Sequence, residues 1–364
     1  MKNPWDVYIA SLADEVSVPA EFSRERWQRL SETGLFAIPS PFDQQLKSLV
    51  QKFRELGLAS SDRGLTFSAV TQIASSIYCL QAYGNDELKQ QFLPKLTTGE
   101  IIGGHAITEE GAGSDVASMQ TTATYDGAGY IINGAKKFIT NAPIADILVI
   151  YARTIRDGVD VGISPFLVPC DREGVTKSPP MNTAGLTSSP IGEIEFHNVR
   201  IPESYRIGFE GGGMMILDQV MKREIVLAFS ANLGEIEQRR NLAIKQANQR
   251  IQFGQSIGAN QLIADKIAGM QMSLELGGAL LEKIAHDIVG FKDISILTIV
   301  AKLFISEQNV ASALDVIQVF GANGYLTDAG LTDMLLDAVP GTIYSGANGT
   351  LRSKLASLVG VRAS

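Results

Sequence analysis

Two stretches of the chain carry small and polar side chains at spacings that suit a bound ligand. The first reads GTIYSGANGTLRSK and runs from residue 341 to 354, with glycine, serine, alanine and asparagine around Tyr344. Glycine lets the backbone approach a ligand closely, because it lacks a Cβ and permits positive φ. The stretch has no acid, histidine or cysteine before Arg352. The residues alone leave three readings open, namely a working site, a loop, or a site whose working residue lies elsewhere in the chain.

The second stretch reads GGHAITEEGAGSD and spans residues 103 to 115. Its small residues, exposed N–H groups and hydroxyl suit an anion such as a pyrophosphate. The stretch is neither GxGxxG nor a P-loop, and an ordinary turn is the alternative. About two dozen residues later, Phe138 and Thr140 close a predicted hairpin. Both could serve a planar cofactor, and core packing is the alternative for Phe138.

A carboxylate lies within the apolar stripe of a predicted helix. The stripe has helical spacing and consists of Leu217, Val220, Met221, Ile225, Ala228 and Ala231. No residue three or four positions from Glu224 is charged, so an exposed intrahelical ion pair is poorly supported. Burial on such a face raises the pKa of a carboxyl group toward that of a useful general base. An ion pair with another element is the structural alternative for Glu224.

The composition limits the classes of function. The chain has 364 residues, a formal net charge of −8, and 45% hydrophobic and 19% charged residues, which predict a globular protein of two to three domains. It has no Lys/Arg-rich run, so nucleic acid is not an expected partner. The apolar runs are too short to cross a bilayer and no signal peptide is evident, so we expect a soluble, cytoplasmic protein without membrane insertion. Two cysteines and three scattered histidines favour neither a disulfide framework nor a metal site.

Three blocks of sequence must position these residues. Residues 1–98 show helical periodicity that is interrupted by Pro94 and Gly99. Residues 99–210 contain the strand-like segments TATYDGAGYIINGAKKFIT, ADILVIYART and IGEIEFHNVRIP, and residues 211–364 return to long helical patterns. The order predicts an α+β protein with an N-terminal helical domain, a middle β domain and a C-terminal helical bundle at these boundaries.

Four motifs resemble those of the acyl-CoA dehydrogenase family, whose members depend on FAD. They read TEEGAGSD, INGAKKFITN, RIQFGQSIGANQ and QVFGANGYLTDAG. They occur in the family's order and cover nearly the whole chain. The resemblance implies a helical N-terminal domain, a middle β-barrel or sandwich domain and a C-terminal four-helix bundle, which agrees with the three blocks.

The resemblance also implies where FAD would bind. Thr108 and Ser114 would contact the flavin and the pyrophosphate, Phe138 would lie against the isoalloxazine, and Thr140 would lie at its N5. The residues that would reach the FAD of a neighbouring subunit are Arg250, Phe253, Gln318, Gly321 and Ala322. An arginine suits a pyrophosphate because its guanidinium combines charge with a fork geometry, and a surface arginine is the alternative.

The resemblance addresses the missing acid as well. In most family members the glutamate of a Tyr-Glu-Gly turn removes the α-proton of the acyl thioester, and TIYSG puts Ser345 in its place here. Serine has no useful basicity near neutral pH. In the isovaleryl-type branch the base lies on the first helix of the C-terminal domain, at the position that corresponds to Glu224, ten residues before Gly234. The resemblance implies Glu224 as the catalytic base, with Tyr344, Ser345 and Gly346 as a wall of the substrate pocket.

The implied reaction is FAD-dependent α,β-dehydrogenation of an acyl thioester, in which Glu224 removes the α-proton and flavin N5 takes the β-hydride. Several positions depart from the family pattern, namely Ile225, Leu336, Ala347 and Gly349. These departures weaken the expectation of an ordinary CoA ester. They suggest a substrate that is tethered to a carrier protein through phosphopantetheine.

Two other functions stay open at the level of sequence. One is a flavin-dependent monooxygenase of the same fold, and the other is a degenerate, non-catalytic flavoprotein subunit. For the dehydrogenase, the resemblance implies an electron acceptor, either an electron-transfer flavoprotein or oxygen. It also implies a homo-oligomer, either a tetramer or a dimer.

Overall fold

The structure is a computed structural model that describes residues 3–12 and 20–361. Its N-terminal helices are α1 (Pro4–Leu12), α2 (Arg24–Glu32), α3 (Leu46–Ala59), α4 (Arg63–Val70), the π-helix η2 (Thr71–Tyr78), α5 (Cys79–Tyr83) and α6 (Asp86–Thr97). Side chains of Ser23, Asp62 and Asn85 accept hydrogen bonds from backbone N–H groups at the starts of α2, α4 and α6. These caps fix where the helices begin.

The helical pattern of the first block is confirmed, with two local differences. First, α4, η2 and α5 follow one another without a break, and the middle part has π-helical rather than α-helical hydrogen bonding. Second, α6 continues through Pro94 and ends at Thr97. The interruption that the sequence predicts at Pro94 therefore comes at Gly99, where φ is +67°.

The middle of the chain forms one mixed sheet. Its strands are β1 (Gly103–Ala106), β2 (Thr122–Tyr125), β3 (Gly129–Thr140), β4 (Ile147–Arg156), β5 (Val159–Pro169), β6 (Val175–Lys177) and β7 (Ile191–Pro202). They run in the order β1-β4-β2-β3-β7-β6, with β5 on the free side of β4. Strands β1 and β2 are parallel to β4, and the other pairs are antiparallel. The three segments that the sequence predicts as strands are β2–β3, β4 and β7.

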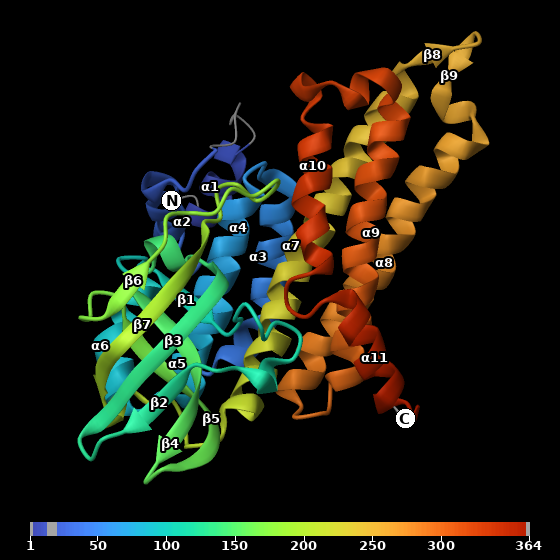
Figure 1. Ribbon diagram of the computed structural model, residues 1–364. Coiled ribbons are helices and arrows are strands. Elements are labelled where there is room, and N and C mark those ends of the chain that lie inside the picture. The colour runs from blue at the N-terminus through green and yellow to red at the C-terminus, as the bar shows by residue number, and fades with distance from the viewer. Residues whose placement is uncertain (1–2, 13–19, 362–364) are drawn as a thin grey trace.

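Long helices make up the rest of the chain. They are α7 (Gly213–Gln249), α8 (Gln261–Val289), α9 (Ser295–Phe320), α10 (Leu331–Ala338) and α11 (Asn348–Leu358), and a hairpin of β8 (Ile251–Gln252) and β9 (Gln255–Ser256) joins α7 to α8. Short 3₁₀ helices are η1 (Phe42–Gln45), η3 (Val116–Ser118), η4 (Ala142–Ile144), η5 (Glu203–Tyr205), η6 (Ile257–Ala259), η7 (Gly321–Tyr325), η8 (Thr327–Ala329) and η9 (Val339–Thr342). Figure 1 shows α7, α8 and α9 side by side as the body of the helical bundle.

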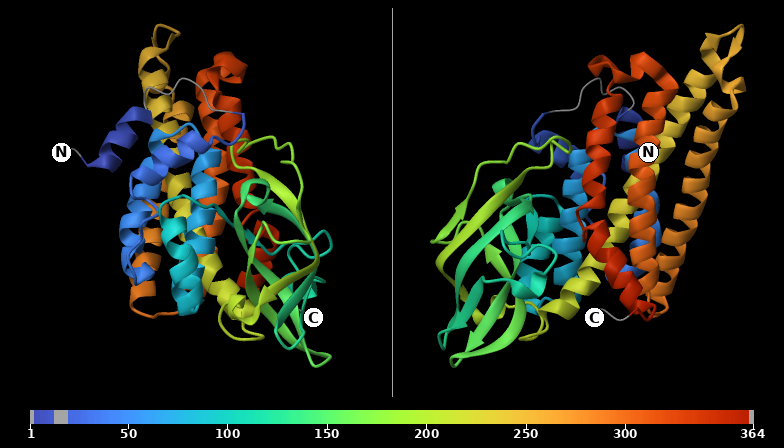
Figure 2. Two further views of the ribbon diagram at one scale, coloured as in Figure 1. Left: turned by 90° about the vertical axis from the view of Figure 1, so that its left-hand side faces the viewer. Right: turned by 45° about the vertical axis from the view of Figure 1, so that its right-hand side comes forward.

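The N-terminal helices lie between the sheet and this bundle (Figure 2). Helix α3 crosses α7 at very short range, since a Cβ on Gly57 would lie 2.0 Å from the Ala231 carbonyl oxygen and one on Gly234 would lie 2.0 Å from the Arg54 carbonyl oxygen. Only glycine permits this approach at both positions. The crossing fixes α7 against the N-terminal block, and α7 is the helix that carries Glu224.

Within the described residues, no helix is both long and apolar enough to cross a membrane. The same part of the chain contains no group of three or more His, Cys, Asp or Glu side chains that could hold a metal ion.

Candidate active site

Glu224 of α7 meets two hydroxyl groups that come from distant parts of the chain. Ser345 Oγ donates to Glu224 Oε1 at 2.6 Å. Ser75 Oγ, from η2, donates to Glu224 Oε2 at 3.1 Å. The predicted base and the serine that stands in place of the Tyr-Glu-Gly acid therefore lie in direct contact.

The surroundings of Glu224 disfavour its charged form. Burial raises the pKa of its carboxyl group, and the hydrogen bonds from Ser345 and Ser75 oppose part of that rise. The two cations beside it in sequence are engaged elsewhere, since Lys222 pairs with Asp218 at 2.7 Å and Arg223 pairs with Asp43 at 2.6 Å. No described residue forms an ion pair with Glu224, so the structural alternative of an ion pair with another element is not found in residues 3–12 and 20–361. A carboxyl group in this setting is suited to accept a proton.

The turn before α11 presents Ser345 to the site. Ser345 is buried and has a φ of +54°, a left-handed conformation that is uncommon for a residue with a Cβ. The exposed Gly346 follows it with a φ of +97°. Tyr344 packs inward, with its ring 4.4 Å from that of Phe67 and 5.7 Å from that of Phe229. Among the three predicted wall residues, only Ser345 forms a hydrogen bond with Glu224. Tyr344 stabilises the turn through its packing against Phe67 and Phe229.

A buried polar network anchors this turn to the bundle. Tyr344 Oη donates to Asn232 Oδ1 at 3.3 Å, and Asn232 Nδ2 donates to Glu235 Oε1 at 3.3 Å. The other oxygen of Glu235 accepts from Asn309 Nδ2 of α9 at 3.0 Å. Since buried networks of this kind fix side chains when their groups are paired, the position of Ser345 depends on α7 and α9 as well as on its own turn.

The four residues predicted to hold FAD within one subunit lie on β3 and on the glycine-rich loop that follows β1. The Lys137 N–H donates to the Thr108 carbonyl oxygen at 2.9 Å and so joins β3 to the glycine-rich loop after β1. Ser114 of that loop forms a hydroxyl–hydroxyl hydrogen bond of 3.1 Å with Thr350 of α11. The register of β3 with β7 shifts between Lys136 and Ile139, as in a β-bulge.

Phe138 lies within this bulge and points out of the sheet. Its φ is +60° and its side chain is 59% exposed, so the alternative of a core residue is wrong. Thr140 is two residues further along the same strand. An outward aromatic ring, nearby hydroxyls and a glycine-rich loop with accessible N–H groups fit a flat ring system that carries a pyrophosphate. The residues of β3 and of this loop therefore fit FAD.

The remaining predicted FAD contacts lie elsewhere. Arg250 and Phe253 belong to the β8–β9 hairpin and its approach, and Gln318, Gly321 and Ala322 lie where α9 ends, at the end of the bundle opposite to α11 (Figure 1). The structure does not bring them to Thr108 or Phe138 of the same chain. Phe253 is fully exposed at the tip of the hairpin, with a φ of +51°. Such a placement is compatible with a contact to another subunit, which stays a prediction.

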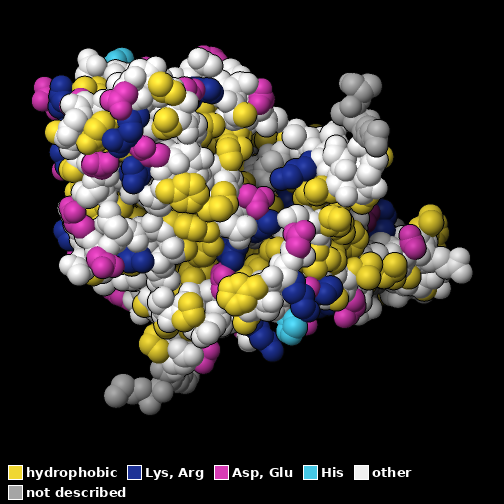
Figure 3. Space-filling view, turned by 90° about the horizontal axis from the view of Figure 1, so that it is seen from below, with side chains coloured by type: hydrophobic (Ala, Val, Ile, Leu, Met, Phe, Trp, Pro, Cys, Tyr) yellow, Lys and Arg dark blue, Asp and Glu magenta, His cyan; other side chains and the backbone are white. Residues whose placement is uncertain are grey.

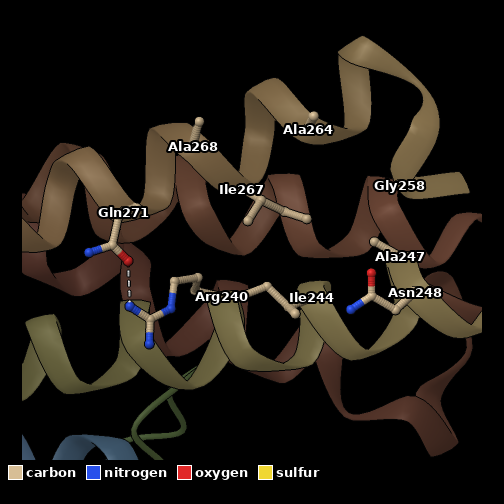
Figure 4. Close-up of a pocket in the computed structure, with 9 residues that line it drawn as sticks. All are labelled: Arg240, Ile244, Ala247, Asn248, Gly258, Ala264, Ile267, Ala268 and Gln271. Atoms are coloured by element: carbon tan, nitrogen blue, oxygen red, sulfur yellow. Dashed lines mark hydrogen bonds between the residues drawn. The ribbon is translucent and has the colours of Figure 1, made fainter.

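A groove of about 440 Å³ lies between α7 and α8, close to the hairpin and away from Glu224. It is lined mainly by short and apolar side chains, and Arg240 spans it to Gln271 with a hydrogen bond of 2.6 Å (Figure 4). The groove shares no lining residue with the Glu224 site. It borders the part of the bundle from which Arg250 extends.

Sequence reasoning missed Ser75 and Asn232. Ser75 lies in a buried helical run without a recognisable motif, and only the fold places its hydroxyl beside Glu224. Asn232 lies eight positions after Glu224 on α7, so a polar residue on a largely buried helix was the available signal.

Family models match all three parts of the chain. Residues 6–100 match the N-terminal domain, residues 104–199 the middle domain and residues 211–359 the C-terminal domain of acyl-CoA dehydrogenase. The order agrees with the predicted blocks.

Individual relatives point the same way. An L-prolyl-[peptidyl-carrier protein] dehydrogenase from Serratia sp. is 36% identical over 307 residues, which are 84% of this chain and 80% of the relative. The solved structure of the prolyl acyl carrier protein oxidase AnaB is 31% identical, with a TM-score of 0.92 and 98% of each chain covered. PigA, solved with FAD and proline, is 31% identical with a TM-score of 0.91, and the match covers 99% of this chain and 97% of PigA. On the three family matches and these similarities, the chain belongs to the acyl-CoA dehydrogenase family.

Proposed function

We propose that this protein oxidises an aminoacyl thioester on a carrier protein and that Glu224 is the base that removes the α-proton. FAD-dependent dehydrogenation of an acyl thioester is the activity of the family to which the chain belongs. The finer proposal is supported above all by the Glu224 carboxyl group, which is half-buried on α7 and accepts hydrogen bonds from Ser75 and Ser345. The carrier-bound prolyl substrates named for the relatives support the tether and the aminoacyl group.

Residues of β3 and of the glycine-rich loop after β1 would hold the cofactor. Thr108, Ser114, Phe138 and Thr140 supply the hydroxyls and the ring described above. Bound FAD would supply the acceptor for the β-hydride.

Side chains and backbone groups of the protein would carry out proton removal and charge stabilisation. Glu224 accepts the α-proton, for which its raised pKa suits it. The backbone N–H of Ser345 has no acceptor among the described residues, so it is free to donate to the thioester oxygen, where negative charge develops. Packing of Tyr344 against Phe67 and Phe229 keeps that N–H in place.

Anaerobic mixing tests this assignment. FAD-loaded protein is mixed with matched acyl and aminoacyl thioesters, and the visible band of the flavin is followed. We expect bleaching with a carrier-bound aminoacyl thioester. Glu224→Gln should abolish it, because a general base typically contributes 10²–10⁴-fold, and Ser345→Ala should retain it. Bleaching that survives in Glu224→Gln would remove Glu224 as the base.

The tether is tested separately with one acyl group on two carriers. Prolyl-CoA and prolyl-carrier protein have the same reacting atoms and differ in the adenine nucleotide and the protein surface. We expect the higher kcat/KM with the carrier protein. A strong preference for the CoA ester would contradict the tether and leave the role of Glu224 intact.

We also propose that the protein is a homo-oligomer in which Arg250 and Phe253 of one subunit contact the FAD of another. The fully exposed Phe253 supports this, since large exposed apolar side chains often mark interfaces. Hydrophobic side chains also gather on the face seen from below in Figure 3. Large exposed apolar side chains include Phe209, which precedes α7, Met215 in the first turn of α7, and Phe291, which follows α8. Analytical ultracentrifugation tests the assembly, and a monomer that retains FAD would overturn it.

A further inference from the structure

The Glu224 carboxyl group is restrained on both of its oxygens. Ser345 binds Oε1 from the turn before α11, and Ser75 binds Oε2 from the N-terminal block. Each carboxylate oxygen therefore accepts one hydrogen bond from a separate element of the fold. A carboxylate offers about four lone-pair positions, so two remain free to accept a proton.

Ser75 owes its position to the π-helical segment η2. Ser75 Oγ reaches Glu224 of α7, whereas the next residue, Ser76, faces the sheet, where a Cβ added to Gly103 of β1 would lie 2.1 Å from Ser76 Oγ. All eight residues of η2 are buried, so the segment is enclosed between two layers. Short π-helical segments are rare and frequently occur at functional sites. Here the segment directs one serine to the base and the other away from it.

We propose that Ser75 is a positioning residue, which acts with Ser345 to hold the Glu224 carboxylate in one orientation for proton transfer. The inference rests on the proposed role of Glu224 as the base. It adds a second hydroxyl, from a part of the chain that the family motifs do not mark, to the machinery that prepares this base.

Within residues 3–12 and 20–361, no charged group acts on the pKa of Glu224 in place of these hydroxyls. On α7 itself, Lys222 and Arg223 are paired with Asp218 and Asp43. Tyr151 of β4 and Tyr344 of the turn before α11 interact electrostatically with Glu224. Burial raises the pKa of both phenols, so both stay neutral near pH 7.

Two further titratable groups lie on η2 and at the start of α5, close in sequence to Ser75. Burial raises the pKa of Tyr78 and raises that of Cys79 to about 12, so neither ionises near pH 7. Ser75 and Ser345 are therefore the groups that stabilise the ionised carboxylate among the described residues.

Loss of either hydroxyl should make Glu224 harder to ionise. A hydrogen bond to a charged group is worth enough to move a pKa by about one unit. A base must be ionised to act, so activity falls as the pH drops through its pKa. We therefore expect Ser75→Ala and Ser345→Ala each to move the acidic limb of the kcat profile upward by about one pH unit.

The experiment compares four variants of the FAD-loaded protein over pH 5–9. Ser75→Ala and Ser345→Ala remove one donor each, and Ser75→Thr restores a hydroxyl. Ser76→Ala is the matched control, because Ser76 lies in the same buried segment and its Oγ has no hydrogen-bond partner among the described residues. The acidic limb should move in the two donor variants, return with threonine and stay in place in the control.

A second measurement does not depend on turnover. In protein labelled with ¹³C at the glutamate carboxyl carbons, the Glu224 resonance is assigned by its absence in Glu224→Gln and then titrated. Its midpoint should rise in Ser75→Ala and Ser345→Ala. Unchanged midpoints in both variants, or an equal rise in Ser76→Ala, would overturn the proposal.

The two levels of proposal fail in different ways. If Glu224→Gln still bleaches the flavin, Glu224 is not the base and the proposed function is wrong. If Glu224→Gln is inactive while the donor variants titrate like the unsubstituted protein, Glu224 remains the base and only the positioning role of Ser75 fails.

Discussion

A buried carboxyl group whose pKa is raised should reduce the stability of the protein that uses it. Burial raises the pKa of Glu224 in the folded state above that of the unfolded chain. At a pH below the unfolded pKa, the carboxyl group is protonated in both states and costs no stability. Stability is lost as the pH rises through the folded pKa. The substitution Glu224→Gln removes this loss, so the variant should be more stable than the unsubstituted protein at pH 8.

The magnitude follows from linkage. Each unit by which the folded pKa exceeds the unfolded pKa corresponds to about 1.4 kcal/mol at high pH. Glutamine can keep both contacts, because its amide oxygen accepts from one hydroxyl and its NH₂ donates to the other. The contacts with Ser345 and Ser75 therefore need not be lost, and the difference between the variants should grow from pH 4 to pH 8.

Urea unfolding at a series of pH values measures this difference, with FAD at one concentration throughout, because bound FAD adds to stability. Glu109→Gln is the matched control of opposite sign. The Glu109 carboxylate pairs with Lys136 at 2.8 Å and accepts from the backbone N–H groups of Gln120 and Thr121 at 2.6 and 3.0 Å, and its pKa is lowered despite burial. Its stabilising effect is present above the unfolded pKa and lost as the pH falls.

Glu109→Gln should therefore be destabilised at pH 8 and approach the unsubstituted protein toward pH 4. The two variants should change with pH in opposite directions. A constant difference between Glu224→Gln and the unsubstituted protein from pH 4 to pH 8 would refute the reasoning. It would show that the fold does not oppose ionisation of Glu224.

Three further outcomes are expected. Gly234→Ala should lower the free energy of unfolding by about 3 kcal/mol or more, because its Cβ would lie 2.0 Å from the Arg54 carbonyl oxygen. Urea unfolding measures this loss, and a loss below about 0.5 kcal/mol would contradict the tight α3–α7 crossing. Arg250→Ala should reduce the ratio of FAD to protein after gel filtration without changing the thermal midpoint of the apoprotein, and full retention would count against its predicted FAD contact. Tyr344→Phe should destabilise the folded protein by about 1 kcal/mol, because the hydrogen bond to Asn232 is lost. It should also lower kcat, which stopped-flow bleaching of the flavin measures. An unchanged kcat would mean that the network does not position Ser345.

The order of the three blocks along the chain and the positions of the strands in the sequence could be predicted, because both depend on local sequence patterns. The alternation in IGEIEFHNVRIP is β7, and long helical patterns after residue 211 are α7, α8 and α9. The raised pKa of Glu224 could be predicted as well, because a lone carboxylate within an apolar stripe is visible in the sequence itself, whereas its role as the base stays a prediction.

The π-helix and Ser75 could not be predicted in the same way. Over eight residues, an i→i+5 pattern differs little from an α-helical one, and all residues of η2 are buried, so no alternation of polar and apolar side chains marks its faces. The contact between Ser75 and Glu224 joins residues 149 positions apart. Such a contact depends on the packing of η2 against α7, which no local pattern specifies.

The serine at the turn and the acid on α7 are two parts of one arrangement. Ser345 Oγ lies 2.6 Å from Glu224 Oε1, so a carboxylate in place of this hydroxyl would lie against the one on α7. Two carboxylates at such a distance cannot both ionise, and one of them would keep a proton at neutral pH. A base on α7 is therefore incompatible with a second carboxylate at residue 345. Serine at residue 345 avoids this conflict, because it leaves room for Glu224 and donates a hydrogen bond that stabilises the ionised carboxylate of Glu224.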